Sequence, residues 1–127
     1  MGFVHASLTL TNPRTGAQMS VRAMVDSGAL LLCVPQHVVM QLQLDELEKR
    51  EVTLADGKRQ LVPYVGPLQV QFANRRCYTG ALVLGDEVLL GAVPMEDMDV
   101  LIDVARHQLI VNPDSPNIAV APVKLAC

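Results

Sequence analysis

The sequence contains no tryptophan, and its aromatic residues amount to two tyrosines and two phenylalanines among 127 residues. Proteins that bind nucleic acids usually offer aromatic rings to the bases and a cationic face to the phosphates. This chain carries a formal net charge of -3 and no long run of basic residues. We therefore expect no nucleic-acid partner. Because half of the residues are apolar, we also expect an aliphatic core.

Cysteine is scarce as well. Cys33, Cys77 and Cys127 are odd in number and widely spaced, and the chain starts without the basic and apolar segments of a secretory signal. This combination predicts reduced thiols and a cytoplasmic protein. No apolar run approaches the length of a membrane span, and Ala6 stands where a myristoylation signal needs serine or threonine. We expect no attachment to a membrane.

The motifs of several common sites are missing. The sequence has no Cys-x-x-Cys or His-x-x-x-His pair that would indicate zinc, and it has no Gly-x-Ser-x-Gly motif of a serine hydrolase. Asp97, Asp99 and Asp103 lack the glycine-containing pattern of a calcium loop, and they are interpreted as a solvated cluster and a strand-end aspartate. We expect no metal and no cofactor.

A cysteine nucleophile is a further alternative. Cys33 and His37 are four residues apart, the spacing that aligns side chains on a helix. Pro35, however, is typical of the first turn of a helix. A helix that begins at Pro35 leaves Cys33 outside it, so the alignment is not expected.

The chain is expected to form a single domain over residues 1–127, because this length buries about two-thirds of the unfolded surface without metal or disulfide support. Most segments alternate apolar and polar side chains, which is typical of strands. The expected strand pairs are 3–11 with 19–25, 52–55 with 58–62, 68–72 with 77–84, and 100–103 with 108–111. A short buried strand is expected over 88–91, and short helices are expected after Pro35 and over 94–98.

Three polar stretches have specific interpretations. Residues 45–51 are nearly all charged and are expected to be a solvated connection rather than part of a binding site. Arg75 and Arg76 are interpreted as a solvated turn between two strands. Asp56-Gly57 predicts a hairpin with a type I′ turn, which needs positive φ at both central residues.

The most informative motif is Asp26-Ser27-Gly28, which follows the apolar stretch 23–25 and precedes the apolar stretch 29–32. An apolar strand that ends at this tripeptide places a carboxylate on the floor of a cleft. It also supplies a hydroxyl to fix the loop and a glycine that substrate can approach closely. The alternative is an ordinary turn, since aspartate, serine and glycine are all favoured in turns.

The order of three motifs resembles the retropepsin-like aspartic peptidases. Residues 25–29 resemble the catalytic motif of that family, 53–57 its flap hairpin, and 88–91 its apolar-apolar-glycine motif before a short helix. The resemblance covers most of residues 3–111. It implies an all-β chain with one or two short helices, folded as a closed acid-protease barrel with one lobe per chain.

The resemblance implies an aspartic endopeptidase that acts on polypeptides. Asp26 would activate water, Ser27 would support the catalytic pair through hydrogen bonds between two loops, and Gly28 would offer its carbonyl to the substrate. Ala29 and Leu30 would also contact the substrate. The flap tip would consist of Ala55, Asp56 and Gly57, and apolar pockets would involve Leu30, Leu54 and Val83.

A homodimer is expected because this peptidase chemistry uses two carboxylates, one as base and one as acid, whereas the chain has a single such motif. Asp26 of each subunit would meet at a two-fold axis. As is known for aspartic peptidases, two carboxylates in contact share one proton and titrate as a unit. An acidic optimum is therefore expected.

Two positions depart from the retroviral pattern. Leu30 stands where retroviral enzymes place an acidic residue, and Ala92 stands where they often place arginine. The acid–arginine pair that braces the retroviral dimer cannot form at these positions, which suggests a cellular relative. The competing function is a noncatalytic dimeric peptide-binding or scaffold module on the same fold.

Overall fold

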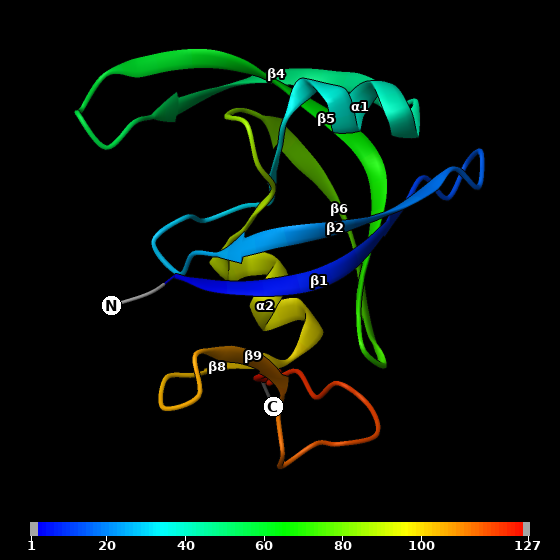
Figure 1. Ribbon diagram of the computed structural model, residues 1–127, viewed down its shortest axis with the longest axis vertical. Helices are drawn as coiled ribbons and strands as arrows, with labels where there is room; N and C mark the ends of the chain where they lie inside the picture. Colours follow the sequence, from blue (N-terminus) through cyan, green and yellow to red (C-terminus); the bar gives the residue numbers. More distant parts are fainter. Residues whose placement is uncertain (1–2, 126–127) are drawn as a thin grey trace.

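The computed structural model describes residues 3–125, which form nine strands and two short helices (Figure 1). Neither helix is long and apolar enough to cross a membrane, and residues 3–125 form no other helix. The elements are, in chain order, β1 (Val4–Thr11), β2 (Gln18–Val25), β3 (Cys33–Val34), α1 (Gln36–Leu42), β4 (Asp45–Thr53), β5 (Arg59–Phe72), β6 (Arg75–Val83), β7 (Leu89–Leu90), α2 (Ala92–Met98), β8 (Val100–Asp103) and β9 (Gln108–Val111).

Seven strands form one sheet in the order β1-β2-β7-β3-β6-β5-β4, and an additional pairing joins β1 to β5. This pairing closes a ring of six strands and leaves β4 outside it. The closure depends on the length of β5, whose 14 residues pair with β4 at one end and with β1 at the other. The expected closed barrel of an all-β chain is therefore confirmed.

The core is aliphatic, as expected from the composition. Alternate residues of β1, namely Ala6, Leu8 and Leu10, are buried, because successive side chains of a strand point to opposite faces. They pack with leucine, valine and methionine side chains from other strands, though not from β4, and from both helices. Phe72 contacts this cluster from its edge and is partly buried.

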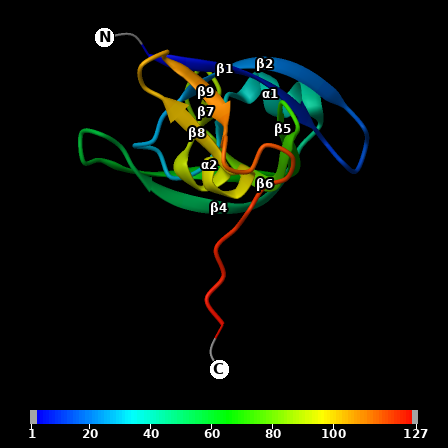
Figure 2. The ribbon, with the colours of Figure 1, turned by 90° about the horizontal axis from the view of Figure 1, so that it is seen from below.

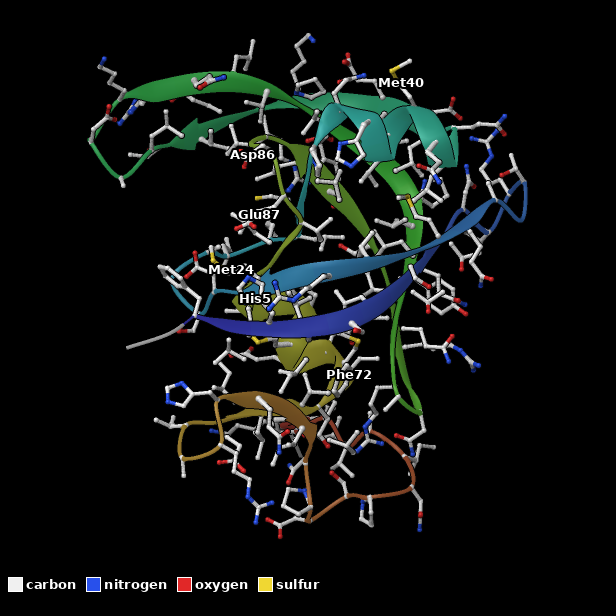
Figure 3. The ribbon with its side chains drawn as sticks, in the orientation of Figure 1. His5, Met24, Met40, Phe72, Asp86 and Glu87 are labelled. Atoms are coloured by element: carbon white, nitrogen blue, oxygen red, sulfur yellow. The ribbon has the colours of Figure 1, made fainter. Side chains whose placement is uncertain are left out.

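The first hairpin and the first helix form where the sequence predicts them. β1 and β2 pair antiparallel, so that His5 faces Met24, and the two side chains lie next to each other in Figure 3. Pro35 is the N-cap of α1, and Cys33 lies in β3, outside the helix. The Cys33–His37 alternative therefore loses the common helix on which it depends.

The interpretation of residues 45–51 as a connection is wrong, because they form most of β4. This strand pairs with β5 from Asp45 opposite Gly66 to Thr53 opposite Arg59. Its side chains are mostly exposed, and among the strands of residues 3–125 it has one neighbour, β5. A charged sequence can form a strand where backbone pairing is available and few side chains need burial.

The interpretation of Arg75 as part of a solvated turn is also wrong, although Arg76 is exposed. Arg75 is the first residue of β6 and is 1% exposed. The turn before this strand consists of Ala73 and Asn74. The guanidinium donates a hydrogen bond to the backbone carbonyl of Ser115. Alternation along β6 turns Arg75 inward and Arg76 outward.

Beside Arg75, one carboxylate fixes the segment that follows β9. Asp99 accepts hydrogen bonds from the hydroxyl of Ser115 at 2.5 Å, from the side chain of Asn112 at 3.0 Å and from the backbone N–H of Val120 at 3.0 Å. These bonds, with Arg75 at 3.9 Å, lower the pKa of Asp99 to about 2. The residues beyond this anchor extend away from the barrel (Figure 2).

We expect Asp99→Asn to remove part of the stability of the wild type, and the difference to depend on pH. The folded state holds Asp99 ionised at a pKa of about 2, below the ordinary value of 3.8. Its contribution is therefore complete above pH 3.8 and is lost as the pH falls to about 2. Thermal unfolding across this range should show the melting temperatures of wild type and variant converging.

Asp114→Asn is the matched control, because Asp114 is an exposed aspartate in the same segment. Its melting temperature should follow that of the wild type at every pH. A constant difference between wild type and Asp99→Asn from neutral pH to pH 2 would contradict the role of Asp99.

Candidate active site

Asp26 lies in the loop that leaves β2, and three hydrogen bonds, two of its backbone and one of its side chain, fix its position. Its N–H donates to the carbonyl of Leu90 in β7 at 3.0 Å, and its carbonyl accepts the N–H of Ala29 at 3.1 Å. Its Oδ1 accepts the N–H of Gly28 at 2.9 Å. The residue is partly buried. Oδ2 makes no hydrogen bond within residues 3–125 and can meet a ligand.

Helix α2 supports the Asp26 loop from the other side. The N–H groups of Ala92 and Val93 donate to the carbonyls of Ala29 and Leu30 at 2.8 and 2.9 Å. Gly91, just before α2, passes so close to the loop that an added Cβ would lie 2.8 Å from the carbonyl oxygen of Ala29 and closer still to that of Leu31. The expected apolar-apolar-glycine motif therefore braces the loop that carries Asp26.

A cleft of about 610 Å³ opens between this loop and the β4–β5 hairpin. The tip of the hairpin projects on the same side of the molecule as the loop after β2 in both ribbon views (Figures 1 and 2). The inner wall of the cleft is apolar and belongs to a cluster separate from the main core. The cleft residues from this cluster are Leu31, Cys33, Val52, Leu82, Leu84 and Leu89.

The hairpin forms around Asp56-Gly57 as expected, but its turn is not of type I′. Within the turn of this hairpin, Gly57 is the residue with positive φ, at 86°. The N–H of Gly57 donates to the carbonyl of Leu54 at 2.9 Å, and the N–H of Leu54 donates to the carbonyl of Lys58 at 2.8 Å. This pattern is a three-residue loop with a glycine bulge. The Oδ1 of Asp56 stabilises it by accepting the N–H of Lys58.

The structure brings most of the expected site residues to one cleft. Asp26, Gly28, Ala29, Leu30 and Ala55 all line it. Ser27, Asp56 and Gly57 are exposed next to the lining residues but do not belong to them.

The apolar wall differs from the expectation at one position. Leu30 and Leu54 line the cleft, whereas Val83 packs on the main core and its neighbours Leu82 and Leu84 line the cleft instead. Strand alternation explains the difference, but the sequence does not reveal which face of β6 meets the cleft. Arg50 and Glu51 also line the cleft, although the sequence predicts a solvated connection at these two positions.

Cys33 and Cys77 are buried, and neither has a catalytic partner within residues 3–125. Burial and the nearby Asp26 raise the pKa of Cys33, which disfavours the reactive thiolate. His37 lines a different hollow, of about 280 Å³, together with Asp86 and Glu87, which lie in the chain before β7 (Figure 3). Cys33 and Cys77 are free thiols, as expected, and Cys127 lies outside the described residues.

Within residues 3–125, no group of three histidine, cysteine or acidic side chains is arranged to hold a metal ion. The titratable groups that line the cleft are Asp26, Cys33, Arg50 and Glu51. Glu51 lies 3.4 Å from the guanidinium of Arg59. The cleft of one chain therefore offers a single carboxylate beside the loop backbone.

Comparison with known proteins finds similarity in structure alone. No protein-family model matches the sequence, and no curated protein matches it. The crystal structure of the retroviral protease-like domain of Ddi1 from Leishmania major aligns with a TM-score of 0.61 and 17% identity over 96% of each chain. This likeness shows a common fold, and it confirms the fold expected from the order of the three motifs.

Two further solved structures align less closely. The Simian Foamy Virus (mac) protease has a TM-score of 0.49 and 20% identity over 72% of this chain and 90% of its own. Lpg0085 from Legionella pneumophila, a protein of unknown function, has a TM-score of 0.41 and 14% identity over 76% of this chain and 89% of its own.

Proposed function

From the retropepsin-like fold of this chain and its single Asp26, we propose an aspartic endopeptidase that hydrolyses peptide bonds as a homodimer. The observation that carries the proposal is the position of the Asp26 carboxylate. It lies partly buried on a braced loop, at the wall of a cleft that a hairpin flanks. Such a cleft suits an extended polypeptide, because a closing hairpin excludes water and offers backbone hydrogen bonds.

Hydrolysis needs a base and an acid on opposite sides of the reacting carbonyl. Asp26 takes a proton from water, whose oxygen then attacks the carbonyl carbon. The protonated Asp26 of the partner subunit gives its proton to the carbonyl oxygen. The tetrahedral species collapses when Asp26 gives the proton that it took from water to the amide nitrogen. Asp26 of the partner subunit takes a proton back from a hydroxyl of the tetrahedral species, and the C–N bond breaks to release the amine and the acid. The two carboxylates share one proton because both cannot ionise cheaply in contact.

A second copy is needed because one chain supplies one suitable carboxylate. The other acidic residue of the cleft is Glu51, which lies on the hairpin beside Arg59. Apolar side chains near the Asp26 loop support contact with a second copy. Leu30 is 66% and Val93 44% exposed, and a hydrogen bond between their backbones holds them together. Phe3 is 77% exposed and also lies near this loop, because the next residue, Val4, pairs with Val25.

The other expected site residues have roles that follow from their positions. Ser27 is exposed in the loop, where its hydroxyl can bond to the loop of the partner subunit. Gly28 and Ala29 border the cleft with backbone groups that can pair with a peptide. Ala55 faces the cleft from the hairpin, and Asp56 and Gly57 form the tip that closes over the substrate.

We expect cleavage to require dimers. The specific activity toward an unstructured polypeptide should rise with protein concentration in step with the dimer fraction measured by sedimentation. Val93→Glu should raise the dimer dissociation constant about tenfold or more, because it buries an unpaired charge in the contact. When wild type and variant are measured at the same concentration, the activity of the variant should fall in proportion to its dimer fraction.

Met40→Glu is the control, since Met40 is also an exposed apolar residue but lies on α1, away from the Asp26 loop (Figure 3). It should leave both the dimer and the activity unchanged. Full cleavage by a protein that sediments as a monomer at every concentration, with substrate present, would refute the two-subunit site.

A further inference from the structure

Arg50 differs from the other charged residues of β4, because it is held at the inner face of the hairpin. Its burial is intermediate, and it lies opposite Val62, a buried residue of the apolar cluster under the hairpin. Two residues further, Val52 packs on the same cluster. Alternation therefore turns the side chain of Arg50 toward this cluster. The neighbouring Glu51 also lines the cleft, but its carboxylate is paired with the guanidinium of Arg59 at 3.4 Å.

The guanidinium of Arg50 is fixed in place by two contacts. Its central carbon lies 3.8 Å from the centre of the Tyr64 ring, and its Nε donates to Oε2 of Glu48 at 2.9 Å. The ring is itself fixed, since the Tyr64 hydroxyl accepts the N–H of Gly80 at 3.1 Å. A Cβ at Gly80 would collide with that ring. The side chain of Arg50 is therefore positioned before any ligand arrives.

The far end of this guanidinium has no partner. Within residues 3–125, Nη1 and Nη2 of Arg50 make no hydrogen bond or ion pair, whereas Nε is occupied by Glu48. Arg50 is the one cationic residue among the described residues that line the cleft. The adjoining wall is apolar, so a charge that reaches Arg50 leaves bulk water in part. Two free N–H₂ groups on one guanidinium match the two oxygens of a carboxylate.

We propose that Arg50 is a specificity-determining residue that binds an aspartate or glutamate side chain of the peptide in the cleft. This inference rests on the proposed function and narrows its substrate class. The favoured substrate is an extended peptide that places an aliphatic side chain against the apolar inner wall of the cleft and an acidic side chain at Arg50. Glu51 does not repel that acid strongly, because the guanidinium of Arg59 lies 3.4 Å from its carboxylate and offsets its charge.

Binding to the Asp26→Asn protein tests the inference without requiring cleavage. The probes are short unstructured peptides with a central pair of leucines and one glutamate moved through the flanking positions, each beside its glutamine counterpart. At one flanking position the glutamate peptide should bind about three- to tenfold more tightly, as expected for a partly solvated ion pair. The preference should shrink as salt is added.

Variants on the same hairpin test whether Arg50 causes the preference for glutamate over glutamine peptides. Arg50→Met, in the Asp26→Asn background, should bring the ratio of glutamate to glutamine affinity to about one. Arg50→Glu should invert the preference in favour of a lysine peptide. Lys49→Met is the matched control, because Lys49 is an exposed cationic residue next to Arg50 that does not line the cleft and is paired with Glu46, and it should keep the original ratio.

A ratio near one in the parent protein, a ratio that survives Arg50→Met, or no binding of any peptide would overturn the role of Arg50. The proposed function fails differently. If the wild type binds the glutamate peptides selectively through Arg50 and never cleaves them, the peptidase chemistry is refuted while the assignment of Arg50 stands.

Discussion

Asp26→Asn is expected to lower peptide-bond cleavage by about a thousandfold or more, the range of a lost general acid–base pair. A homodimer of this variant loses both carboxylates at once. Asparagine has the size of aspartate, and its Oδ1 can still accept the N–H of Gly28 that shapes the loop. It cannot take a proton from water. The loss should therefore concern chemistry, with the melting temperature close to that of the wild type.

The measurement is the cleavage of an unstructured polypeptide between acidic and neutral pH, with and without a pepstatin-type inhibitor. Asp103→Asn is the control, because Asp103 also accepts a backbone N–H, that of Arg106 at 3.2 Å, but belongs to β8. It should retain full activity. Cleavage that persists in Asp26→Asn would dismiss Asp26 as the catalyst. Binding without cleavage by the wild type would favour the noncatalytic peptide-binding or scaffold module.

Gly91→Ala is expected to destabilise the protein by about 3 kcal/mol or more, the upper range for a group forced into a packed interior. The backbone at Gly91 has φ of -88° and ψ of -177°, which any residue adopts. Glycine is therefore required at this position for steric reasons and not for its backbone angles. The added methyl group would meet the carbonyls of Ala29 and Leu31, and these are backbone atoms that cannot rotate away. Relief requires a shift of the loop that carries Asp26.

Gly85→Ala provides the matched control, since its φ is 78° and an added Cβ meets nothing within 4 Å. This substitution forces a non-glycine residue into positive φ without causing a collision. It should lower the free energy of unfolding by about 1 kcal/mol. Urea unfolding of both variants measures the difference. A free energy of unfolding for Gly91→Ala equal to that for Gly85→Ala would show that the loop and α2 are not locked together. Residual folded Gly91→Ala should also cleave poorly, because the loop is displaced.

The features that the sequence predicted best are those with a local signal. Asp56-Gly57 between apolar runs marked a hairpin, and Pro35 marked the start of a helix. The tripeptide at Asp26 marked the loop after an apolar strand. Each depends on the preference of a few neighbouring residues, so no distant contact is needed to recognise it.

The features that the sequence did not reveal depend on distant partners. Arg75 is buried because the carbonyl of Ser115, forty residues later, meets its guanidinium. Leu82 rather than Val83 lines the cleft because Leu82 pairs with Cys33, which faces the cavity. The register between distant strands decides these positions, and a shift of one residue would exchange the two faces of β6.

The charged side chains of β4 have a further physical consequence, because β4 is an edge strand of the sheet. β4 ends the strand order, so one row of its N–H and C=O groups is not bonded to another strand. Such a row can template the growth of a fibril by adding strands from other molecules. The acidic and basic side chains from Asp45 to Glu51 make that stacking unfavourable. They can thus act as gatekeepers that keep the exposed edge of this hairpin from starting aggregation.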